Sequence, residues 1–108
     1  MTLSDLYDVL DGVLKDKVAY NAFPVKEAPA LPYIVFYATG TDNYAADNVP
    51  YFERINVRIE LYETSRDFTL EGTLESALTS SGLFWERDDT YIEAEKTYEV
   101  IYEVQIYG

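Results

Sequence analysis

One stretch of alternation constrains the fold more than any other feature of the sequence. Between residues 51 and 62, apolar and polar side chains take turns with a period of two. That period is the repeat of a β-strand with one face in a hydrophobic core. Pro50 stands at its start, where a proline is tolerated. The strand presents Ile55, Val57, Ile59 and Leu61 to one side and Arg54, Asn56, Arg58 and Glu60 to the other.

Two segments have the longer period of an amphipathic helix. Residues 2–17 repeat apolar side chains at three and four positions, and Thr2 is placed to cap the helix. A second helix is predicted from a cap at Ser65 or Asp67 to about Ser80, with Gly82 beyond its end. The apolar stripes are Leu3, Leu6, Leu10, Val13 and Leu14 in the first helix and Leu70, Leu74, Ala77 and Leu78 in the second.

The rest of the chain is predicted to form strands and their connections. Residues 19–23 suit a short edge strand, and the aromatic and β-branched run 33–37 suits a buried strand. Residues 39–48 are rich in turn formers and lack a period, which predicts a loop, and residues 39–50 are expected to be mobile in the isolated subunit. Residues 83–87 and 97–107 are expected to pair as a hairpin around a turn at 92–96. The predicted fold is a single α+β domain over residues 1–108, ordered α-β-β-β-α-β-β, with two helices on a mainly antiparallel sheet.

The two periods together predict the hydrophobic core. Each helix contributes its apolar stripe, and each strand contributes alternate residues. For residues 33–37 the inward pair is Ile34 and Phe36, or Val35 if the face is inverted. The expected core is Leu6, Leu10, Val13, Leu14, Ile34, Phe36, Ile55, Val57, Ile59, Leu61, Leu74, Leu78, Val100, Tyr102 and Val104.

Composition excludes several classes of function. The chain has no cysteine and no histidine, which removes disulfides, thiol catalysis and the commonest metal ligand and general base. Its formal charge of −12 repels a phosphate backbone, so nucleic-acid binding is not expected. No apolar run is long enough to span a bilayer, and residues 1–5 lack the features of a signal peptide. A protein without a cofactor, made in a reducing cytoplasm and with no membrane association, is expected.

Because cysteine and histidine are absent, the carboxylates of Asp and Glu are the candidate catalytic groups. Asp88 with Asp89, Glu93 with Glu95, and Glu99 with Glu103 are candidate acid–base pairs, although their alternation with core residues is typical of a solvated sheet face. The oxygen-rich residues of segment 39–48 could also attract calcium. Their spacing does not match an EF-hand loop, and such residues usually serve turns. No catalytic, cofactor or metal site is predicted.

Polar and aromatic residues outside the expected core are candidates for contacts with other proteins. Tyrosines beside the expected loop suit contact anchors as well as they suit local packing. Arginines on the strand and after it can bind the carboxylates of a neighbouring subunit through bidentate pairs. Reversing Arg58 to Glu is expected to weaken self-association and leave the fold intact. The candidate contact residues are Asp42, Asn43, Tyr44, Asp47, Asn48, Tyr51, Arg54, Arg58 and Arg66.

The texture of the sequence resembles a family of small structural proteins from tailed phages and prophages. The resemblance rests on Leu-Pro-Tyr-Ile-Val-Phe-Tyr at 31–37, Thr-Gly at 39–40, Asp-Asn-Tyr at 42–44, Ala-Asp-Asn at 46–48 and Ile-Glu-Leu-Tyr at 59–62. Residues 91–96 and 98–103 look like the same group. The chain is similar to tail terminator, or tail completion, proteins and to head–tail joining proteins of like size.

This resemblance implies a structural role in the virion. Such proteins form a ring, usually of six subunits, that caps the tail tube and joins it to the head. The implied partners are further copies of the chain, the tail tube protein and a head–tail connector protein, assembled in the host cytoplasm. A second reading is an acidic DNA mimic that inhibits a nuclease or a restriction enzyme, which would need carboxylates at phosphate-like spacing on one surface.

Overall fold

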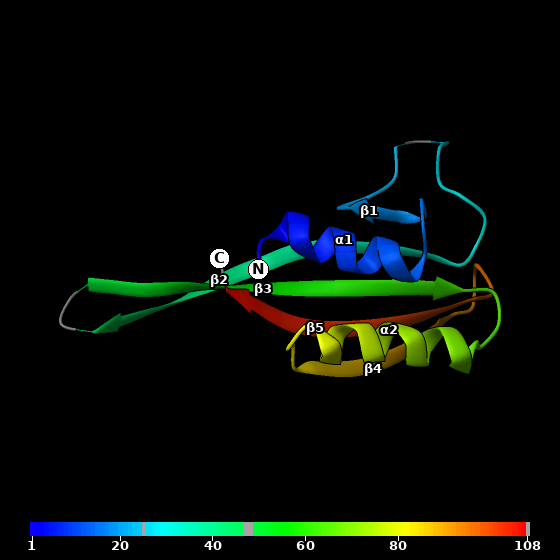
Figure 1. The fold of residues 1–108 in the computed structure, drawn as a ribbon. Coiled ribbons are helices and arrows are strands. Elements are labelled where there is room, and N and C mark those ends of the chain that lie inside the picture. Colours follow the sequence, from blue (N-terminus) through cyan, green and yellow to red (C-terminus); the bar gives the residue numbers. More distant parts are fainter. Residues whose placement is uncertain (25, 47–48, 108) are drawn as a thin grey trace.

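Five strands form a single sheet in the order β1-β2-β3-β5-β4 (Figure 1). The computed structural model describes residues 1–24, 26–46 and 49–107. The strands are β1 (Val18–Tyr20), β2 (Tyr33–Ala46), β3 (Val49–Glu63), β4 (Trp85–Ile92) and β5 (Thr97–Tyr107). Neighbouring strands are antiparallel except for β1, which pairs with β2 in parallel. The predicted element order and the mainly antiparallel sheet are confirmed.

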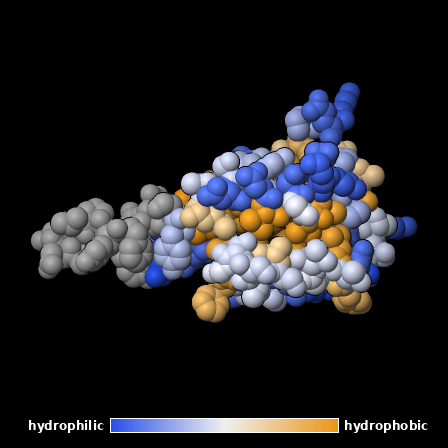
Figure 2. Space-filling view, viewed as in Figure 1, coloured by the Kyte–Doolittle hydropathy of each residue, from blue (hydrophilic) through white to orange (hydrophobic). Residues whose placement is uncertain are grey.

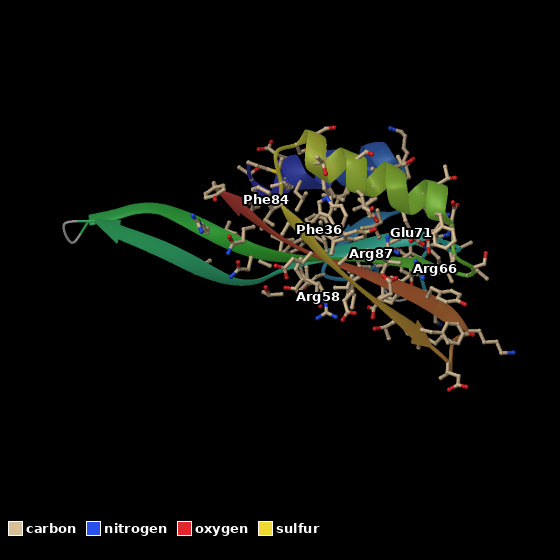
Figure 3. The ribbon with its side chains drawn as sticks, turned by 90° about the horizontal axis from the view of Figure 1, so that it is seen from below. Phe36, Arg58, Arg66, Glu71, Phe84 and Arg87 are labelled. Atoms are coloured by element: carbon tan, nitrogen blue, oxygen red, sulfur yellow. The ribbon has the colours of Figure 1, made fainter. Side chains whose placement is uncertain are left out.

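Helices α1 (Leu3–Val13) and α2 (Phe68–Ser80) lie side by side on one face of this sheet (Figures 1 and 3). Their outer surfaces are mostly polar, and a hydrophobic strip shows between them (Figure 2). The opposite face of the sheet carries no helix. The molecule therefore has two layers, with the core between helices and sheet.

Helix α1 begins as the sequence predicts but ends earlier. The Asp5 amide donates to Thr2 Oγ1 at 3.0 Å and the Thr2 amide donates to Asp5 Oδ2 at 2.8 Å, a reciprocal capping box. The predicted end at residue 17 is wrong, because the helix stops at Val13. Asp11 Oδ1 accepts the Asp16 amide at 2.9 Å, and Asp16 adopts a left-handed φ of 62°. This turn frees the following residues to enter β1.

The predicted core is confirmed almost residue by residue. Val57, Ile59 and Leu61 of β3 are buried beneath the helices, and Ile34 and Phe36 are the inward pair of β2. Val35 is buried on the opposite face. Three predicted members are only partly buried against the cluster, namely Val13, Leu14 and Ile55. Val18, Leu83 and Ile106 join the core without having been predicted.

Truncating Val57 tests the central strand. Its side chain is buried between neighbouring strands and the helix layer. Val57→Ala is expected to lower the free energy of unfolding by about 1–3 kcal/mol, through lost burial and a residual cavity. Urea denaturation followed by circular dichroism measures the change. An unaltered midpoint would contradict the packing of this strand.

Three strand predictions need correction. Residues 39–46 are not a loop: they continue β2 and pair with β3 through two register shifts, at Ala38/Gly40 and Tyr44/Ala45. Residues 47 and 48 lie outside the described residues. The strand predicted at 83–87 begins at Trp85 and runs to Ile92, because residues 83–84 complete the end of α2. The edge strand predicted at 19–23 is Val18–Tyr20. The turn predicted near 92–96 is confirmed, since β4 ends at Ile92 and β5 begins at Thr97.

Across the described residues, neither helix is long and apolar enough to cross a membrane.

Candidate functional site

The β2–β3 hairpin projects from the body as a two-stranded arm (Figure 1). On one side, pairing with β1 ends at Phe36. On the other, pairing with β5 ends where Arg54 meets Tyr107. Beyond these points, β2 and β3 pair only with each other. We define the arm as residues 39–46 and 49–53. A two-stranded ribbon is marginally stable alone in water, so an arm of this kind gains from packing against another surface.

The structure places four of the nine predicted contact residues in this arm, namely Asp42, Asn43, Tyr44 and Tyr51. Asp42 pairs in register with Arg54, and Tyr44 pairs with Phe52. Asn43 and Tyr51 lie in the same two strands. Their backbone positions are described, but the side chains of residues 42–53 are not. Asp47 and Asn48 lie outside the described residues. At the arm's base, the Arg54 guanidinium lies 5.2 Å from the centre of the Tyr107 ring.

Arg66 lies far from the arm and is engaged within its own chain. Its Nε and Nη2 donate to the two carboxylate oxygens of Glu71 at 3.1 and 2.8 Å, and Asp89 lies 3.2 Å from Nη2. Arg87 donates to Glu71 from the other side and also to Glu75 and Asp89. This ion cluster comprises Arg66, Glu71, Glu75, Arg87 and Asp89, between α2 and β4, and only Glu71 is fully buried in it (Figure 3).

Glu71 is the centre of the ion cluster. Its side chain is 1% exposed. Burial alone would raise the pKa of Glu71, but hydrogen bonds from Arg66 and Arg87 lower it to about 2. Sequence reasoning missed Glu71 and Arg87. The available signal was that Glu71 falls on the inner stripe of α2 with Leu74 and Leu78, where an acid needs a buried partner.

The face of the sheet without helices has its own network. Tyr37 and Tyr62 hydroxyls approach Glu60 at 3.3 and 3.1 Å, and Tyr62 also approaches Glu99 at 2.8 Å. Burial raises the pKa of Glu99, and burial with these acid neighbours raises the pKa of Tyr62. Val35 and Ile101 are buried among these polar side chains. Strand alternation and register give this open face the acids Glu60, Glu86, Asp88, Glu99 and Glu103 and the arginines Arg54 and Arg58.

Arg58 belongs to the open face, where its Nε donates to Glu60 at 3.1 Å. The prediction that Arg58→Glu leaves the fold intact stays a prediction, and this pairing shows that the variant would carry a local cost in the sheet. The new carboxylate would stand beside Glu60 and opposite Glu103, where like charges destabilise a sheet. Arg58→Gln is the better variant for testing contacts with a neighbour, because it removes the charge without adding repulsion.

The structure separates two of the candidate carboxylate pairs and leaves the third in an exposed turn. Asp89 binds Arg87 on the helix side of the sheet, whereas Asp88 lies opposite Ile101 on the open face. Glu99 and Glu103 share the open face but are four residues apart along β5. At the rise of a strand they are separated by about 13 Å, more than paired catalytic carboxyls require. Glu93 and Glu95 lie in the exposed turn between β4 and β5.

Comparison with solved structures finds a fold similar to that of this chain. No protein-family model matches the chain, and a search of curated proteins finds no match. Among solved structures, the fold is similar to a chain in the virion of a native gene transfer agent particle. That likeness has a TM-score of 0.55 at 13% sequence identity. It covers 93% of this chain and 85% of the other, so the two share a fold nearly from end to end.

Proposed function

We propose that this protein is a structural component of a phage-like virion, which forms a ring that caps the tail tube and joins it to the head. The observation that carries the proposal is the fold it shares, over 93% of its length, with a virion chain. The resemblance to tail terminator and completion proteins supports the finer assignment. The proposed partners are further copies of the chain, arranged as a hexamer, with the tail tube protein on one side and a connector protein on the other.

The arm suits a subunit that works only in an assembly. Among the described residues, the backbone of the arm pairs with no third strand, and its ribbon extends beyond the rest of the sheet (Figure 1). In a ring, the edge of the arm would meet a neighbouring subunit, which would order it and cover its unpaired backbone groups. The contact residues predicted from the sequence concentrate on this arm, and we assign them to that role.

The open face suits the lining of a channel that carries DNA. Its acids outnumber its arginines, and the whole chain carries a formal charge of −12. A negative wall repels phosphates and lets DNA pass without adhering. We propose that this face points toward the lumen of the ring.

We expect ring formation to be favoured by high salt and to require the arm. Subunits of charge −12 repel one another, and salt shortens the Debye length from about 10 Å at 0.1 M to about 3 Å at 1 M. Sedimentation velocity across this range, with negative-stain microscopy, should find monomers in dilute low-salt buffer and rings at high salt and concentration. A variant in which Asn-Gly replaces residues 42–54 removes most of the arm and Arg54 at its base. It should stay monomeric with the body folded, because Thr41 and Ile55 face each other in register.

Two outcomes would contradict the proposal. Loss of oligomers as salt rises would refute assembly limited by repulsion. A chain that stays monomeric at every salt concentration but binds a basic nuclease, less tightly as salt rises, would favour the DNA mimic.

A further inference from the structure

Phe84 is a fixed apolar knob on the surface. Its side chain is 96% exposed. The residues around it are held tightly: the Leu83 amide donates to Leu78 O and the Gly82 amide to Thr79 O, both at 3.0 Å, which is a Schellman motif. Gly82 has the required positive φ of 79°. On the other side, Trp85 Nε1 donates to Thr79 Oγ1 at 3.0 Å. Phe84 is thus held in the solvent by a rigid connection between α2 and β4 (Figure 3).

An aromatic hollow lies at the other edge of the sheet. It has a volume of about 300 Å³ and is lined by Leu3, Ser4 and Tyr7 of α1, Tyr20 of β1 and Phe36 of β2. Tyr20 meets Phe36 edge to face with ring centres 5.2 Å apart, and Tyr7 lies 6.3 Å from Phe36. Tyr7 and Tyr20 are themselves partly exposed. Walls of this kind accept a further aromatic ring at favourable stacking distances.

The knob and the hollow lie at opposite ends of the strand order. Phe84 directly precedes β4, the last strand on one edge, and the hollow is formed around β1, the last strand on the other. Two different patches at opposite edges give a head-to-tail contact, which closes into a ring when each step adds the same rotation. Neither patch contains a charged residue. The contact itself is therefore apolar, although each copy carries −12.

We propose that Phe84 of one subunit packs into the hollow formed by Leu3, Ser4, Tyr7, Tyr20 and Phe36 of the next copy of this chain. The inference rests on the proposed function, because it supplies the contact by which the ring closes. Each subunit gives one knob and receives one, so the contact has a direction around the ring. Exposed aromatic residues seated in a pocket are the usual source of most of the binding energy at an interface.

Two variants each remove one half of the contact. Phe84→Ser removes the knob and keeps the hollow. Ser4→Glu places a charge in the hollow and keeps the knob, and an acid in the first turn of α1 suits the helix dipole, so folding is retained. Phe68→Ser is the matched control, because Phe68 is also a well-exposed phenylalanine, 71% exposed, at the opposite end of α2. Circular dichroism verifies that every variant is folded.

Sedimentation at 1 M salt across a wide range of protein concentration is the test. Phe84→Ser and Ser4→Glu should each raise the concentration needed for assembly by about tenfold or more, and Phe68→Ser should not. An equimolar mixture of Phe84→Ser and Ser4→Glu retains one knob and one complementary hollow. It should form dimers and stop there.

Each other outcome overturns the inference in a distinguishable way. Rings that persist in both variants, or a mixture that gives no dimer, would overturn the knob-and-hollow contact and leave the proposed ring standing. An equal loss with Phe68→Ser would show unspecific apolar association instead. A wild-type chain that never associates at any salt or concentration would overturn both the contact and the ring.

Discussion

Replacing Arg87 with alanine is expected to lower the free energy of unfolding by about 3 kcal/mol, the largest loss from any single surface-accessible cation in the described residues. Arg87 pairs with Glu71, Glu75 and Asp89. Its removal leaves the buried Glu71 carboxylate with Arg66 as its remaining cationic partner. Breaking a buried ion pair costs about 3–5 kcal/mol, and the retained Arg66 places this loss at the lower end.

Arg58→Ala is the matched control for that experiment. It removes the same charge from the chain, but Arg58 is one-third exposed and pairs with Glu60 on the open face. A partly exposed pair contributes about 1 kcal/mol or less. Urea denaturation followed by Trp85 fluorescence and circular dichroism measures both variants. Equal midpoints for Arg87→Ala and Arg58→Ala would show that burial of the ion cluster adds nothing to stability.

The helix and sheet layers of this fold could be predicted because the spacing of apolar residues indicates which face of each helix or strand is buried. The alternation of Ile55, Val57, Ile59 and Leu61 identified the central strand, and the stripe of Leu6 and Leu10 identified α1. The predicted boundaries of the helices and strands were less accurate. The hydrogen bond from the Asp16 amide to Asp11, which accompanies the end of α1, leaves no mark on the apolar pattern.

The arm escaped prediction because its composition opposes its structure. Thr39, Gly40, Asp42 and Asn43 are common in turns, and glycine, aspartate and asparagine are depleted in strands. Their strand conformation comes instead from pairing with β3, the strand with the clearest alternation in the sequence. Strand propensity depends on such cross-strand partners, which a local window of sequence does not contain.

For the predicted contact residues, too, the sequence pattern indicated exposure but did not identify the residues that they contact. Arg66 was predicted to bind the acids of a neighbouring subunit because its planar fork of donors suits carboxylates. Within its own chain it contacts Glu71 and Asp89, from α2 and β4. The sequence pattern correctly placed Arg58 off the core face. It did not reveal that Glu60 and Glu103 lie next to this position. In each case the missing information was which distant residue lies opposite.

Replacing Glu63 with glutamine is expected to stabilise the protein at pH 8 and to leave its stability unchanged near pH 4.5. Glu63 is buried on the helix side of the sheet, and neither of its oxygens meets a donor at hydrogen-bonding geometry among the described residues. Burial and the nearby charge of Glu71 raise the pKa of Glu63 to about 8. The folded protein therefore keeps a proton on Glu63, which can donate to Glu71.

The pH dependence follows from the direction of each shift. Between about pH 4.5 and pH 8 the folded state holds the Glu63 proton and the unfolded state has released it, so stability falls as pH rises. Glu71, whose pKa is lowered to about 2, stabilises the fold above pH 4.5 and loses that contribution as the pH falls toward 2. Together these two groups place the maximum of stability near pH 4.5–5.

Glutamine at position 63 keeps a donor for Glu71 and has no proton to lose. The free energy of unfolding of Glu63→Gln should therefore exceed that of the wild type by at least about 1 kcal/mol at pH 8, the equivalent of less than one pKa unit. Thermal and urea denaturation at half-unit intervals from pH 4 to 9 would trace the two curves. Glu93→Gln, in the exposed β4–β5 turn, removes the same charge and should run parallel to the wild type. If the Glu63→Gln curve also runs parallel, Glu63 is ionised in the folded protein and the buried proton does not exist.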